Sequence, residues 1–245
     1  MTQKLFPTFL LIIFVFGACT PVYYRANPQN IPLLQAKGDM VLTGGLSSGS
    51  VLTGSASFGF DAQYAQALTN QWGVMANISS FKGVGGVYIP SGYLAEGGGG
   101  YFHPFGSGFV FECYGGIGIG SVDNRSSTPD TLKVYRGNSV HLVRLFVQPS
   151  IGYSSKHFEA AFSIRLCGMQ YYGGSYDLRD STNLDSYQYL TTQKWIGSIE
   201  PALTIKLGSD RVKYFWQQLL VKPLSNDIRF LYTPSTTLVG IQFRL

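Results

Sequence analysis

Hydrophobic and polar residues alternate at every second position over most of the chain after residue 38. The segment 158–166 is typical, because Phe162 and Leu166 fall on one face while Glu159 and Arg165 fall on the other. A period of two is the pattern of β-strands with one apolar and one polar face. No segment of helix length shows a period of 3.6 residues, so the pattern predicts an all-β chain.

Ten alternating segments separated by turn-forming residues predict ten strands, at residues 38–47, 55–69, 71–82, 93–105, 108–122, 138–154, 157–171, 193–208, 211–222 and 230–245. The ninth segment is apolar on both faces, which leaves eight spanning strands as the alternative. Tight links near Asn70, Gly106, Ser155 and Gly208 alternate strictly with long ones at 83–92, 123–137 and 172–192. Short periplasmic turns alternating with long extracellular loops are typical of outer-membrane barrels. The sequence therefore predicts an antiparallel up-and-down transmembrane β-barrel with both chain ends in the periplasm.

Charged residues of the predicted strands share the face opposite the apolar residues. An Arg or Lys facing lipid at mid-bilayer costs about 2–4 kcal/mol, so the polar face should be the lumen. The lumen is predicted to hold six acids and four bases, namely Asp39, Asp61, Glu96, Glu112, Glu159, Glu200, Arg144, Arg165, Lys206 and Arg244. Side-chain pairs should largely block so narrow a lumen. We expect the two surplus acids to meet neutral polar groups, water or a residue of the N-terminal segment.

Residues 1–18 have the features of an export signal, with Lys4 before an apolar run and small residues at its end. The tetrad FGAC at 16–19 resembles the lipobox of bacterial lipoproteins. That resemblance implies cleavage after residue 18 and acylation of Cys19, which would place a lipidated N-terminus on the periplasmic side of the outer membrane.

Residues 19–37 contain three prolines and show no clean periodicity. We predict that they form an extended periplasmic tether, which precedes a barrel domain at 38–245. A short plug folded into or beneath the barrel is the alternative.

The last strand ends on the alternating apolar residues Ile241, Phe243 and Leu245. This pattern resembles the terminal signal read by the barrel-assembly machinery. Together with GFDAQY at 59–64 and YFHPFG at 101–106, it makes residues 38–245 resemble small outer-membrane β-barrels of the superfamily that includes OmpA-type and OmpW-type barrels. The resemblance implies the outer membrane of a Gram-negative bacterium, contact with its lipid, and the assembly machinery as a partner during biogenesis.

Composition and candidate chemistry narrow the function further. Only 13% of the 245 residues are charged and 45% are hydrophobic, which argues against disorder. The net charge of +5 is scattered, so no nucleic-acid partner is expected. The three histidines lack metal-ligand spacing, and we predict no metal site and no cofactor. Ser139 and His141 share a strand face but lack an orienting carboxylate, so no catalytic residue is assigned.

These observations favour a lipid-anchored outer-membrane barrel, not an enzyme, with a structural or partner-binding role. It would serve as an accessory subunit of an envelope complex or bind a ligand at the cell surface. A narrow channel for small solutes is the alternative, and an outer-membrane lipid-modifying enzyme is the less favoured one.

Overall fold

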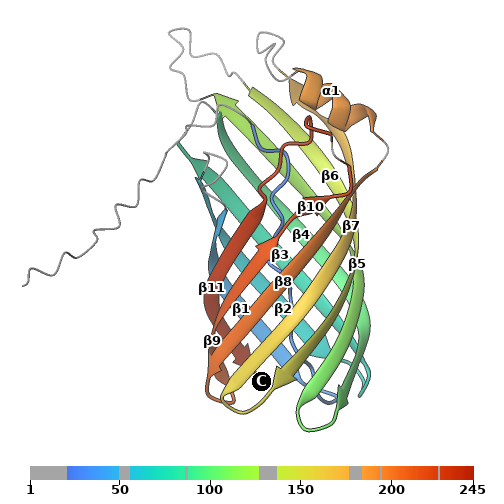
Figure 1. Cartoon of the computed structure of the whole chain (residues 1–245), viewed down its shortest axis with the longest axis vertical. Coiled ribbons are helices and arrows are strands. Elements are labelled where there is room, and N and C mark those ends of the chain that lie inside the picture. The colour runs from blue at the N-terminus through green and yellow to red at the C-terminus, as the bar shows by residue number, and fades with distance from the viewer. Residues whose placement is uncertain are drawn as a thin grey trace, which may run out of the picture.

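The computed structural model of the chain describes residues 21–49, 56–85, 88–126, 137–176, 184–193, 195–225 and 227–245. Within these ranges, ten long strands form one closed antiparallel barrel (Figure 1). They are β1 (Met40–Gly49), β2 (Ala56–Ala67), β3 (Trp72–Val84), β4 (Tyr88–Phe105), β5 (Phe109–Ser126), β6 (Gly137–Ser154), β7 (Phe158–Tyr176), β8 (Ile196–Gly208), β9 (Val212–Leu220) and β11 (Ser235–Arg244). A two-residue strand, β10 (Lys222–Pro223), adds to β8.

Strands that are neighbours in sequence pair with each other from β1 to β9, and β11 closes the ring between β9 and β1. At the closing seam, Val41 lies opposite Arg244 and Gly49 lies opposite Thr236. Closure satisfies the backbone polar groups that an open sheet edge would expose to lipid. The predicted ten-stranded barrel is confirmed, and the eight-stranded alternative is wrong because β9 pairs along its length with both neighbours.

The two ends of the barrel differ in their connections. At the turn end, tight turns join β2 to β3, β4 to β5, β6 to β7 and β8 to β9, and the C-terminus lies there (Figure 1). At the loop end lie the helix α1 (Leu184–Thr192) and the segment that leads into β11. Strands β4 to β7 contain 18 or 19 residues, well above the roughly 9–11 that cross a bilayer, so they extend past it. Among the described residues, no helix has the length and apolarity to cross a membrane.

The predicted long links are partly regular structure. Strand β4 begins at Tyr88, inside the expected loop 83–92, while β5 and β7 continue to Ser126 and Tyr176. The expected loop 172–192 also contains α1. Sequence alternation continues only weakly into these extensions, because they lie beyond the lipid and need no apolar outer face.

The outer surface carries the apolar half of each strand. At the turn end, seven rings from five strands follow one another with centroids 5.4–6.5 Å apart: Trp72, Tyr101, His103, Phe105, Phe109, Tyr153 and Phe158. Such an aromatic girdle is typical of the level at which a barrel meets the lipid headgroups.

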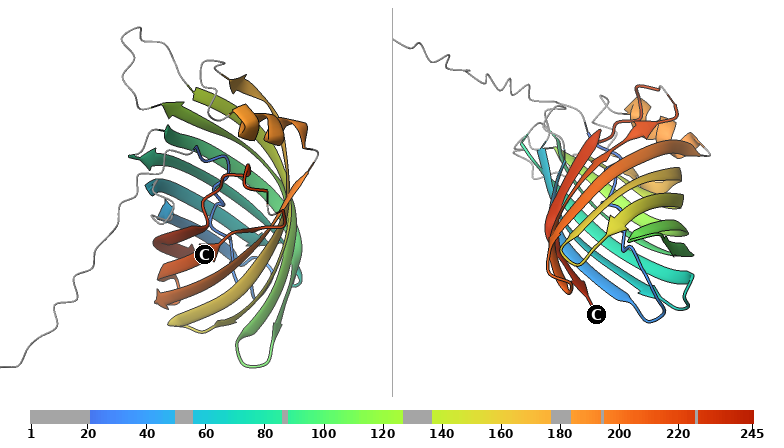
Figure 2. Two further views of the ribbon diagram at one scale, coloured as in Figure 1. Left: turned by 45° about the horizontal axis from the view of Figure 1, so that its top comes forward. Right: turned by 60° about the horizontal axis from the view of Figure 1, so that its bottom comes forward.

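Residues 21–34 run through the interior of the barrel, from the loop end to the turn end (Figures 1 and 2). All of them are buried, and we call them the plug. This finding corrects the expected periplasmic tether at 19–37 and favours the plug alternative, because within the described part of that range only residues 35–37 are exposed. The predicted signal peptide and Cys19 lie outside the described residues.

Candidate functional site: the plugged lumen

The plug is extended, and a single parallel bridge between Tyr24 and Tyr232 is its strand-type contact among the described residues. The rest of its backbone polar groups need side chains of the barrel wall. Gln217 supplies both partners for Gln29, because its side chain accepts from the Gln29 amide at 2.8 Å and donates to the Gln29 carbonyl at 2.9 Å. Gln148 donates to the carbonyl of Asn30 at 2.8 Å. Amide side chains on the lumen face therefore take the place of a neighbouring strand.

Charged wall residues hold the plug backbone nearer the turn end. Lys206 Nζ donates to the carbonyl of Ile31 at 2.7 Å, and Arg244 Nη2 donates to the carbonyl of Pro32 at 2.9 Å. The amide of Leu34 donates to Glu112 Oε1 at 3.0 Å. Prolines suit this path, since a proline has no amide hydrogen to leave unpaired.

Four charged side chains from β4, β6, β7 and β8 meet at the middle of the lumen, and none is exposed. We call Glu96, Arg144, Arg165 and Glu200 the central network. Arg144 donates from Nε to Glu96 Oε1 at 2.8 Å and lies 3.9 Å from Glu200. Arg165 lies 3.6 Å from Glu96 and 3.9 Å from Glu200. Each arginine is thus shared between the two acids, which limits the cost of burying charge.

The plug completes the central network with two side chains. Tyr24 donates its hydroxyl proton to Glu200 and accepts from Arg144 Nη1 at 2.6 Å. Asn27 donates to Glu96 at 2.6 Å and accepts from Arg165 Nη1 at 2.9 Å and from Arg144. The plug therefore supplies hydrogen-bond partners to both acids and both arginines of the central network, while Glu200 Oε2 has, in the part of the chain that the structure describes, only the two arginines at 3.9 Å.

A second group of charges lies at the turn end, and we call Asp39, Glu159, Lys206, Lys213 and Arg244 the turn-end cluster. Glu159 lies 3.0 Å from Lys206, 3.2 Å from Lys213 and 3.3 Å from Arg244, which also pairs with Asp39. Asp39 and Arg244 are partly exposed at a mouth cavity of about 500 Å³. Solvent thus has access to the outer two residues of this cluster, Asp39 and Arg244, but not to the central network.

The two surplus acids are also linked to the plug, Glu112 directly and Asp61 through Ser47 of β1. Ser47 donates to Asp61 at 2.5 Å and accepts from Arg25 Nη2 at 2.9 Å. Glu112 accepts the Leu34 amide, with Ser150 3.5 Å away.

Arg25 and Lys213 raise the bases of the described lumen to six, equal to the six predicted acids. The sequence prediction missed both. Lys213 was overlooked because its strand has apolar residues on both faces, and Arg25 because its segment was assigned to a tether.

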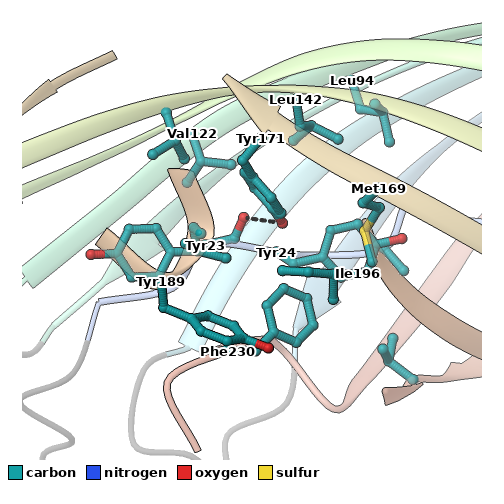
Figure 3. Close-up of a cluster of buried hydrophobic side chains, with 14 of the residues drawn as sticks. Tyr23, Tyr24, Leu94, Val122, Leu142, Met169, Tyr171, Tyr189, Ile196 and Phe230 are labelled. Atoms are coloured by element: carbon teal, nitrogen blue, oxygen red, sulfur yellow. Dashed lines mark hydrogen bonds between the residues drawn. The ribbon is translucent and has the colours of Figure 1, made fainter. Parts of the chain in front are cut away.

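An aromatic cap closes the lumen above the central network. Tyr23, Tyr24, Tyr171, Tyr189 and Phe230 pack together there, and Tyr189 comes from α1 (Figure 3). Tyr171 donates to the carbonyl of Tyr23 at 3.2 Å, and the Phe230 ring lies 6.0 Å from that of Tyr24. Parts of the chain far apart in sequence thus seal the loop end around the first residues of the plug.

Little space remains beside the plug. A cavity of about 10 Å³, lined by residues that include Gln29, Thr43 and Gln242, has room for about one water molecule. Within the described chain, the lumen at this height holds protein instead of a file of water.

The structure places the predicted residues as follows. Eight of the ten predicted lumen charges are buried inside the barrel: Asp61, Glu96, Glu112, Arg144, Glu159, Arg165, Glu200 and Lys206. Asp39 and Arg244 lie at its turn-end mouth.

The terminal-signal residues Ile241, Phe243 and Leu245 lie on the outward face of the seam strand. Ser139 bonds to Ser175, and His141 lies against Tyr172. In the described ranges, no three His, Cys, Asp or Glu side chains are grouped to hold a metal ion.

Comparison with solved structures supports this fold. The translocator domain of the autotransporter NalP from Neisseria meningitidis is similar, with a TM-score of 0.53 and 10% identity over 86% of this chain and 90% of that one. This chain has the fold of an outer-membrane β-barrel. The barrel also matches Ail of Yersinia pestis (TM-score 0.37, 11% identity, 85% and 99% covered) and OprG of Pseudomonas aeruginosa (0.38, 12%, 87% and 98%). No protein-family model and no curated protein matches the barrel's sequence.

Proposed function

We propose that this chain is a closed, lipid-anchored barrel of the Gram-negative outer membrane, with a structural or partner-binding role. The observation that carries the proposal is the plug, which fills the lumen and supplies partners to the central network. A solute channel needs a continuous water path, and a catalyst needs a reactive side chain positioned by others. The plug and the paired charges of the lumen favour neither role.

Removing the plug to open a channel would be costly. It would break the bonds of Tyr24 and Asn27 to buried charges, and a hydrogen bond to a charged group contributes about 1.5–3 kcal/mol. Several such bonds would break together. The barrel with the plug in its lumen is therefore the stable form on which the proposed function rests.

The loop end offers a surface for a partner. Ile228 is 89% exposed, between Asp227 and Arg229. Arg229 bonds to Asp227 and lies 4.4 Å above the ring of Tyr189, which fixes this short segment against α1. Because this side chain projects from a loop that is fixed against α1 beyond the lipid, we choose it as the position at which to test partner binding.

Planar-bilayer recording tests the closed lumen. We expect the wild-type barrel to show no steady conductance. A protease site between Ala36 and Lys37, where the chain is exposed, allows the plug to be cut after folding and released with mild urea. Release should open a conductance, while the cut barrel without urea stays silent as the matched control. Stable, ion-selective conductance from the uncut wild type would contradict the proposal.

Two experiments test the anchor and the partner surface. Cys19→Ser should abolish labelling with a palmitate analogue, and continued labelling would rule out acylation at that residue.

In pull-downs from native membranes, Ile228→Asp should lose a co-purifying protein that the wild type and Lys156→Ala, a turn-end control, both retain. Equal recovery with all three chains would exclude this surface.

A further inference from the structure

The plug has a direction along the barrel axis. At the loop end, the amide of Val22 donates to Asn124 Oδ1 at 2.9 Å, and the amide of Tyr23 donates to the carbonyl of Leu231. At the turn end, the amide of Lys37 donates to Asn70 Oδ1 at 3.0 Å, in the turn between β2 and β3. The chain therefore enters the lumen at the loop end and leaves it at the turn end, just before β1 begins (Figure 2).

The loop end is the end that faces out of the cell. Bacterial outer-membrane barrels keep short turns in the periplasm and long connections outside. Here the four tight turns and the C-terminus share one end, while α1 and the extensions of β4 to β7 occupy the other. The first described residue, Pro21, is thus at the extracellular end, opposite to the side expected from the sequence.

We propose that the mature N-terminus lies on the cell-surface side of the outer membrane, so that acyl chains on Cys19 anchor in the outer leaflet. This inference rests on the outer-membrane location in the proposed function. Cys19 is two residues from Pro21, and two residues span at most about 7 Å. The aromatic cap and the plug fill the lumen beneath Pro21, which leaves no room for the chain to turn back toward the periplasm.

The proposed anchor gives the plug a fixed point at each end. Beyond the turn end, the plug continues covalently into β1 of the wall. At the loop end, two or three acyl chains could not enter a lumen that the plug and the aromatic cap already fill. The plug then cannot slide through to the periplasm, which fits a barrel that stays closed.

Epitope accessibility on whole cells tests the orientation. The same short epitope is inserted between Thr20 and Pro21, next to Ile228 at the loop end, or between Ser155 and Lys156 at the turn end. We expect antibody to stain intact cells for the first two, and to stain the third only after permeabilisation. Staining of the first epitope only after permeabilisation, with the Ile228 epitope stained on intact cells, would overturn the inference.

The same three chains separate failure of the inference from failure of the proposed function. If the Ser155 epitope stains intact cells and the Ile228 epitope does not, the barrel is inverted; the inference falls while the closed barrel stands. If the chains are absent from the outer-membrane fraction, both the proposed outer-membrane location and the inference are wrong.

Disulfide trapping provides a readout without an inserted epitope. In a chain with Cys113→Ala and Cys167→Ala, the pair Val22→Cys and Asn124→Cys should cross-link in cells. The matched pair Val22→Cys and Asn70→Cys should not, because these residues lie at opposite ends. Cross-linking of the second pair instead of the first would show that the plug runs the other way.

Discussion

The central network and the turn-end cluster use the same chemistry in different surroundings. The four central side chains are wholly buried, and the plug meets them with the side chains of Tyr24 and Asn27. At the turn end, a mouth cavity admits water to Asp39 and Arg244, and the plug offers backbone carbonyls to Lys206 and Arg244. Substituting a plug side chain should therefore lower the stability of the barrel at the centre. At the turn end such a substitution should have little effect, as long as the plug backbone keeps its path.

Removing one arginine of the central network should have the largest effect. Arg144→Met leaves Arg165 as the one cation of the central network beside Glu96 and Glu200, and breaking a buried ion pair costs about 3–5 kcal/mol of unfolding free energy. Reversible urea unfolding in lipid vesicles, followed by tryptophan fluorescence, measures the loss. The double variant Arg144→Met with Glu96→Gln should recover part of it. No recovery would mean that the loss comes from packing and not from charge.

Changing the plug at the centre should come next. Asn27→Leu removes the acceptor of two arginines and a donor to Glu96, which should cost about 1–3 kcal/mol. Pro32→Ala, the control near the turn end, keeps the carbonyl that Arg244 binds and should cost less than about 1 kcal/mol. Similar losses of unfolding free energy in the two variants would show that the plug side chains contribute equally at the centre and at the turn end, which contradicts the prediction.

A smaller effect is expected within the turn-end cluster. Lys213→Met leaves Glu159 with Lys206 and Arg244, so the loss should be about 1.5 kcal/mol, the lower end of the range for a hydrogen bond to a charged group. The same unfolding assay measures it beside Arg144→Met. A loss as large as that of Arg144→Met would show that solvent access does not moderate the turn-end charges.

The smallest effect concerns the exposed pair on the outer loop. Hydrogen bonds from Arg229 lower the pKa of Asp227 to about 2. The charged form is favoured, so the contact is retained above the ordinary carboxyl pKa and lost only as the pH falls through about 2. A carboxyl NMR titration should show Asp227 ionised throughout pH 4–8. In Arg229→Gln the backbone amide of residue 229 still donates to Asp227, so the pKa of Asp227 should rise toward its ordinary value without reaching it, with no measurable change in the urea midpoint.

The wall of the barrel was predictable because lipid imposes a strict pattern on it. Outward positions such as Phe162 and Leu166 must be apolar, and inward charges such as Glu159 and Arg165 must avoid lipid. That constraint is periodic and local, so a single sequence reveals it. The predicted bounds of β6 and β9 accordingly differ from the observed ones by only a few residues.

The contents of the lumen were less predictable, because they depend on contacts between distant residues. Nothing local distinguishes a proline-containing tether in solvent from one bonded to Gln217 and Gln148. Strand β9 shows the same difficulty: Lys213 faces the turn-end cluster, but Phe215 and Leu219 on the same face hide the polar pattern. A surplus of two acids in the predicted lumen was the one sign that a further base was missing.

The path of the plug determines how the barrel would bear a mechanical load. A force applied to Pro21 along the barrel axis would act on the bonds to Asn124, Gln217 and Lys206 together, because plug residues at successive positions along its path make them. Bonds loaded in shear resist together, whereas a strand peeled from one end loses its bonds one after another. Pulling the chain from its loop end should thus require much more force than peeling β11 from the C-terminus.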